Sequence, residues 1–196
     1  MTDYFALLNQ PRRPWLDTEE VKHAFHARAL QAHPDAKPQQ GAESSSDALF
    51  AELNEAYQVL QDPKRRLQHL LTLEGHPPDR ASGATPTTIE ALFPLVAAAT
   101  NRATALVKQS AAATNALTRS LLKSELQNAS KDVATVQGKV RELYDTSIAC
   151  LQRLDQSWDN DSRPEPNQLK QLYLELSYVT RWLQELEEKR LQLSTC

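Results

Sequence analysis

The chain has 196 residues, of which 40% are hydrophobic and 24% charged, a balance typical of folded globular proteins. The formal net charge of −3 gives no reason to expect nucleic acid as a partner. No apolar run approaches the ~18 residues that a membrane-spanning helix needs, and the first residues lack the pattern of a secretory signal. Cys150 and Cys196 fit neither a disulfide framework nor a metal spacing. These features predict a cytoplasmic protein with no membrane partner and no bound metal or cofactor.

Helix signals follow one another through the first 75 residues. We expect a short helix at residues 3–9, and a second from Asp17, a capping residue, to about Ala32, just before the helix-disfavouring Pro34. A polar loop then leads to a third helix at about residues 47–60. After Asp62 a basic helical segment runs to Gly75.

Residues 76–87 contain three prolines and no hydrophobic period, so they are predicted to link two domains. Three apolar stripes follow at mostly three- and four-residue spacing, which is typical of helices that pack against partner helices. The stripes are Ile89, Leu92, Phe93, Val96, Ala103 and Leu106, on a helix expected to reach Leu122; Val133, Val136, Val140, Leu143, Leu151 and Leu154; and Leu169, Leu172, Leu176, Val179, Leu183 and Leu186. The sequence therefore predicts an all-α protein, with one domain at residues 1–75 and an antiparallel three-helix bundle at 88–196.

The tripeptide His33-Pro34-Asp35 lies between the second and third predicted helices. Proline stiffens a loop, and the Asp35 carboxylate suits bidentate pairing with a partner arginine. The flanking sequence adds an aromatic start (Tyr4-Phe5), an apolar and basic second helix, and Asp62-Pro63 followed by three basic residues.

In this order and spacing, residues 3–70 resemble the J domain of the DnaJ family. The resemblance implies a helical hairpin that exposes the His33-Pro34-Asp35 loop at its tip. It further implies that this loop and the second helix bind the ATPase domain of a DnaK- or HscA-type chaperone. Lys22 and His26 lie one turn apart, on the side of that helix away from Val21. We expect them to form a small positive strip that steers an acidic partner surface into place.

A further resemblance is to the HscB (or Jac) family, co-chaperones of iron–sulfur cluster assembly. It rests on total length, on the C-terminal bundle, and on the stretches Leu16-Asp17-Thr18, Arg66 to Gly75, Tyr144-Asp145-Thr146 and Leu186 to Leu191. In that family the bundle binds the scaffold protein IscU through an apolar patch, to which Leu92, Phe93 and Val96 correspond. The resemblance thus implies an IscU-like client at these three residues, although they would suit the bundle core equally well.

No phosphate loop, nucleophile motif or metal-ligand set is present in the sequence, so no enzymatic activity of its own is expected. Two hypotheses follow. In the first, the chain is a co-chaperone that stimulates a chaperone ATPase and delivers a client. In the second, it is a J-like adaptor that scaffolds an assembly through its bundle and stimulates nothing.

Overall fold

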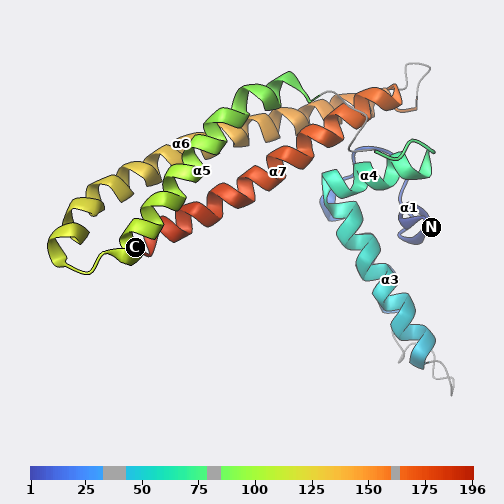
Figure 1. Cartoon of the computed structure of the whole chain (residues 1–196). Helices are drawn as coiled ribbons and strands as arrows, with labels where there is room; N and C mark the ends of the chain where they lie inside the picture. Colours follow the sequence, from blue (N-terminus) through green and yellow to red (C-terminus); the bar gives the residue numbers. More distant parts are fainter. Residues whose placement is uncertain (33–42, 79–84, 160–163) are drawn as a thin grey trace. The chain divides into compact units, whose positions relative to one another are not determined.

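The computed structural model describes residues 1–32, 43–78, 85–159 and 164–196. Within these ranges the chain forms helices and no strand, which confirms the all-α prediction. It divides into two compact units (Figure 1). Unit 1 comprises Met1–Ala81 and Cys150–Tyr173, and unit 2 comprises Ser82–Ala149 and Leu174–Cys196. The predicted division into residues 1–75, 76–87 and 88–196 concerns independent folding, and it stays a prediction.

Aspartates cap the helices α1 and α4 in unit 1. The Asp3 carboxylate accepts hydrogen bonds from the amides of Phe5 and Ala6 and caps α1 (Tyr4–Leu7). Asp62 caps α4 (Pro63–Leu73) in the same way, with Pro63 at the first helical position, where its missing amide hydrogen costs nothing. After α4 the chain leaves the helix at Gly75, whose φ of 77° favours glycine.

The helices α2 (Thr18–Ala32) and α3 (Glu43–Gln61) pack against each other. Asp17 Oδ1 accepts hydrogen bonds from the amides of Glu19 and Glu20 at 2.8 and 3.2 Å, which confirms the predicted cap. The rings of Phe25 and Tyr57 stack between the two helices with centroids 4.7 Å apart. The prediction that the third helix begins near residue 47 was wrong, because α3 already starts at Glu43.

The core of unit 1 draws on distant parts of the sequence. Residues from α1 to α4 supply most of it, and the end of α6 with the start of α7 supplies the rest. The buried apolar residues are Phe5, Leu8, Leu16, Val21, Leu53, Ala56, Val59, Leu60, Leu67, Leu70, Leu71, Leu151, Trp158, Leu169, Leu172 and Tyr173.

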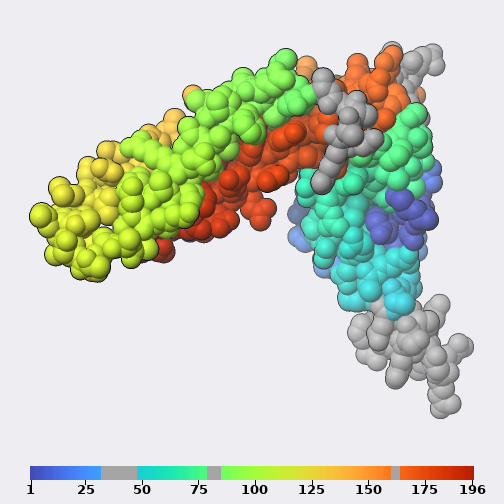
Figure 2. All heavy atoms as spheres, in the orientation of Figure 1, coloured from blue at the N-terminus to red at the C-terminus, as the bar shows by residue number. Residues whose placement is uncertain are grey.

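Unit 2 is an antiparallel bundle of α5 (Thr87–Ala112) with parts of α6 (Ala116–Gln156) and α7 (Pro166–Ser194) (Figure 1). In Figure 2 the atoms of α5 lie directly beside those of α7 along the bundle, with no open gap between the two helices. Most residues of the predicted stripes supply or flank its core, but Leu151, Leu169 and Leu172 belong to the core of unit 1, because the end of α6 and the start of α7 pack there. The buried cluster is Ile89, Val96, Ala99, Ala103, Leu106, Leu126, Ala129, Val133, Val140, Val179, Trp182, Leu186 and Leu193.

The expectation that the first bundle helix reaches Leu122 was wrong. The chain leaves α5 at Ala112, and α6 begins at Ala116, where the Asn115 side chain accepts a hydrogen bond from the amide of Thr118 at 2.8 Å. The residues beyond the turn join the next stripe, because Leu126 and Ala129 continue the three-four spacing of Val133 upstream. In the part of the chain that the structure describes, no helix has the length and hydropathy required to span a membrane.

Candidate functional site

The exposed face of α2 carries the candidate partner-binding side chains. Val21 is fully buried, whereas Lys22 and His26 are exposed, one turn apart on a side of the helix that faces away from Val21. The Lys22 ammonium lies 3.3 Å from the Glu19 carboxylate on the same helix. The positive charge of this strip is therefore partly balanced by its own helix.

Leu30 continues this strip toward the end of α2. It follows His26 by four residues, as His26 follows Lys22, so all three lie along one face. The Leu30 side chain is 74% exposed, so it offers apolar surface on this face. Leu30 stands three residues before His33 in the sequence; His33, Pro34 and Asp35 lie outside the described residues.

The three candidate client-binding residues have different environments in unit 2. Val96 is 3% exposed and belongs to the core, and Leu92 is half-buried against it. Phe93 is 57% exposed, because it lies at the edge of the α5 stripe and not at its centre. Of the three side chains, only Phe93 offers a large surface to a partner.

Phe93 belongs to an aromatic cluster, with Trp182 and Tyr178, that links α5 to α7. The Phe93 ring centroid lies 6.3 Å from that of Trp182, which lies 5.7 Å from that of Tyr178. Trp182 is buried, whereas Tyr178 is 36% exposed. Sequence reasoning missed Tyr178, because the spacing of a stripe does not indicate which flanking residues stay exposed.

Unit 1 contains a polar contact that no spacing in the sequence predicts. The Arg13 guanidinium pairs with the Asp155 carboxylate, with Nη2 2.8 Å from Oδ2, and this hydrogen bonding raises the pKa of Arg13. The Trp15 amide donates to the same carboxylate at 3.0 Å, and Trp158 Nε1 donates to the Arg12 carbonyl at 2.7 Å. We call this group of contacts the clasp; it comprises residues 12–15, Asp155 and Trp158. It binds the loop before α2 to the end of α6.

Arg66 of α4 also binds the loop before α2. Its side chain is fully buried, and Nε donates to the Pro14 carbonyl at 2.9 Å while Nη1 donates to the Leu60 carbonyl at 2.6 Å. The guanidinium also lies over the Trp15 ring, 5.5 Å from its centroid. A buried charge requires such partners, because an unpaired one would cost several kcal/mol.

His69 anchors α1. It is 5% exposed, its Nε2 accepts a hydrogen bond from the Tyr4 amide at 3.1 Å, and its ring stacks with Tyr4 at 4.6 Å. Burial lowers the pKa of His69, with Asp3 opposing and Arg12 reinforcing that shift. The neutral imidazole is thus the form that the fold requires, since only it can accept this bond.

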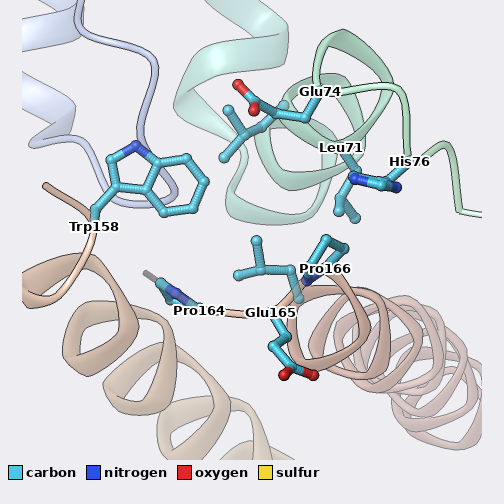
Figure 3. Close-up of a pocket in the computed structure, with 9 residues that line it drawn as sticks. Leu71, Glu74, His76, Trp158, Pro164, Glu165 and Pro166 are labelled. Carbon is cyan, nitrogen blue, oxygen red and sulfur yellow. The ribbon is translucent and has the colours of Figure 1, made fainter. Parts of the chain in front are cut away.

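A pocket of about 320 Å³ lies beside the clasp in unit 1. Figure 3 shows Trp158, Leu71, Pro164 and Pro166 around it, with the Glu165 carboxylate directed away from its centre. Its walls are largely apolar side chains of α4 and of the start of α7. Nowhere in the described ranges are three His, Cys, Asp or Glu side chains grouped so that they could hold a metal ion.

The N-terminal part of the chain matches a known family. Residues 3–69 match the family model described as "DnaJ domain". Over 67 residues the chain is 40% identical to Chaperone protein DnaJ of Caldicellulosiruptor saccharolyticus, covering 34% of this chain and 16% of that protein. Over 64 residues it is 44% identical to Chaperone protein DnaJ 2 of Thermus thermophilus, covering 33% of this chain and 21% of that protein. The chain thus spans about a fifth or less of these relatives, and what it shares with them is a DnaJ domain.

Solved structures extend the likeness to the whole chain. Chaperone HscB from Vibrio cholerae superimposes with a TM-score of 0.62 at 20% identity, covering 98% of this chain and 99% of that one. Human co-chaperone protein HscB gives a TM-score of 0.57 at 18% identity, covering 96% and 82%. Residues 3–69 are thus a DnaJ domain, and the chain as a whole has the fold of HscB, as the sequence predicted.

Proposed function

We propose that this protein is a co-chaperone that stimulates the ATPase of a DnaK- or HscA-type chaperone and delivers a client to it. The observation that carries the proposal is a DnaJ domain with an intact His33-Pro34-Asp35 directly after α2. The ATPase activity belongs to the chaperone partner. The proposed compartment is the cytoplasm, and neither nucleic acid nor a membrane is among the proposed partners.

The docking surface that we propose consists of this tripeptide with Lys22 and His26, and Leu30 extends it. Lys22 and His26 supply polar contacts and steering, and Leu30, three residues before the tripeptide in the sequence, supplies apolar area. A partner with an acidic surface beside an apolar one would fit this arrangement.

A single-turnover ATPase assay tests the proposal. The intact protein should accelerate ATP hydrolysis by the cognate chaperone, whereas His33→Gln and Asp35→Asn should abolish the acceleration with no change in helical content. Leu30→Ser should weaken docking, and Leu117→Ser, an equally exposed leucine on α6, serves as its matched control. Equal rates with the intact protein and the Asp35→Asn variant, for every chaperone of the host, would rule out the co-chaperone function.

One observation favours the adaptor function as a second candidate. Lys22 is already paired with Glu19, so the α2 strip offers little free positive charge to an acidic partner. An adaptor would bind its client through unit 2 but leave the ATPase rate unchanged. The same assay therefore separates the two candidates.

The proposed client is an IscU-like iron–sulfur scaffold protein, bound at unit 2 near Phe93. The support for this is the HscB fold together with the exposed rings of Phe93 and Tyr178. Exposed aromatic side chains are frequent energetic centres of protein interfaces.

Paired variants can distinguish a binding role from a packing role. Phe93→Ser should weaken client binding in calorimetry and change the melting temperature little, because the side chain is 57% exposed. Val96→Ser should do the opposite, since emptying a buried apolar site typically costs about 2–5 kcal/mol of folding free energy. If the intact protein does not bind the scaffold protein of its own host, the iron–sulfur role is excluded while the co-chaperone function stands.

A further inference from the structure

A groove of about 580 Å³ lies in unit 2 where α5 ends, α6 begins and α7 ends, close to the C-terminus marked in Figure 1. Serine residues from all three helices line it: Ser110 of α5, Ser120 and Ser130 of α6, and Ser194 of α7. Arg119 and Lys123 of α6 add two cations, and no Asp or Glu side chain is among the lining residues. The lining is therefore rich in hydrogen-bond donors and positive in charge.

In the described part of the chain, no Asp or Glu side chain neutralises the two cations of this groove. Among the described residues, neither Arg119 nor Lys123 is paired with a carboxylate, whereas Arg102 and Arg190 of the same unit pair with Asp132 and Glu187 at 2.7 and 2.9 Å. From Ala103 to Ser124 the sequence has three basic residues and no acidic one. The groove thus lies in a part of unit 2 where the local charges favour the binding of an anion.

Arg119 is held in place before any ligand arrives. Its Nε donates to the Ala113 carbonyl at 3.2 Å, in the turn between α5 and α6. That bond occupies one of the five N–H donors of the guanidinium and restrains its plane. A restrained guanidinium loses less conformational entropy on binding a planar or tetrahedral oxyanion than a free side chain does.

The floor of the groove is apolar. Leu126 and Leu193 line it and are 8% and 6% exposed. We infer that the groove binds an organic phosphate: the phosphate group pairs with Arg119, Lys123 and the serine hydroxyls, and the organic part covers the two leucines. The volume supports this, because small-molecule sites are typically about 300–1,000 Å³, larger than a bare phosphate ion needs.

Phenyl phosphate is a suitable probe, because it joins a phosphate dianion to a small apolar ring. In a titration followed by amide NMR shifts, it should perturb residues around the groove and bind more tightly than either phenol or inorganic phosphate. Lys123→Gln should weaken it by about tenfold, as expected for the loss of one charge-assisted hydrogen bond. Lys139→Gln, which removes the same charge from an exposed site on α6 outside the groove, should leave the affinity unchanged.

Cys196 lines the groove and provides a second, independent measurement. In a Cys150→Ser background, the quantity to measure is the rate at which Cys196 reacts with anionic iodoacetate, divided by its rate with neutral iodoacetamide. This ratio should be higher when Lys123 is present than in the Lys123→Gln variant. Phenyl phosphate should protect the thiol. Equal binding of phenol and phenyl phosphate, or an equal loss of affinity in the Lys123 and Lys139 variants, would overturn the inference.

Discussion

Units 1 and 2 are both helical, but different kinds of contact stabilise them. Unit 1 depends on polar groups taken out of water, namely Arg66, His69 and Asp155, each bonded to a distant part of the chain. The buried polar groups of unit 2 are Thr100 and Ser147, and the Thr100 hydroxyl donates only to carbonyls of its own helix. An apolar stripe supplies the rest of the unit 2 core. Specific single contacts should therefore matter more in unit 1, and total apolar burial more in unit 2.

The largest effect is expected from Arg66→Leu. The substitution leaves the carbonyls of Pro14 and Leu60 without their buried donor and removes the cation from the Trp15 ring. Together these losses should lower the free energy of unfolding of unit 1 by about 3 kcal/mol. Hydrogen exchange read separately for the two units is the suitable measurement.

Thr100→Val in unit 2 is the matched control for that variant. It also removes a buried hydrogen-bonding group, but its partner carbonyls already accept bonds within α5, so the cost should be about 1 kcal/mol or less. If Thr100→Val costs as much as Arg66→Leu, the proposed difference between the units is wrong.

A smaller effect is expected from acidification, and in unit 1 alone. Burial lowers the pKa of His69 below its usual 6.5, so the unfolded chain binds more protons than the folded one as the pH falls below about 6.5. The contribution of His69 is complete above that pH and is lost as the pH falls through the folded pKa. Unit 2 contains no histidine and should show no such loss in this range.

His69→Gln provides the control for the pH measurement, because the glutamine carbonyl can accept the Tyr4 hydrogen bond but does not titrate. In this variant the melting temperature should therefore change less between pH 7.5 and pH 5.5 than in the intact protein. An unchanged pH dependence would show that His69 is not the group responsible.

The smallest effect is expected at the surface of α2. Lys22→Glu should lower chaperone stimulation a few-fold, and salt should weaken the intact protein, because charges are screened beyond roughly 10 Å at 0.1 M ionic strength. Glu19→Gln should raise stimulation at low salt, since it releases Lys22 from its ion pair. If neither salt nor either substitution changes the stimulation of the chaperone ATPase, the strip takes no part in docking.

The difference between the units also decided what could be predicted from the sequence. Periodicity predicted the helices of the bundle, because the apolar spacing that stabilises each helix is visible in a short stretch of sequence. Asp17 correctly marked the start of α2. The end of α5 was misplaced although Leu126 and Ala129 already continued the next stripe. The clasp could not be predicted, because Arg13 and Asp155 are 142 residues apart and no spacing rule connects them. The exposure of Phe93 and the burial of Val96 likewise depend on packing against α7.

The central claim is that one chain both stimulates the chaperone and presents a client to it. The most direct test is the single-turnover ATPase rate of the cognate chaperone, measured with the intact protein in the presence and absence of the scaffold client. The rate should rise with the protein alone and rise further with the client. Phe93→Ser should lose only the second increase, whereas Asp35→Asn should lose both. A client effect that survives Phe93→Ser, or a rate that the intact protein does not change, would contradict the account.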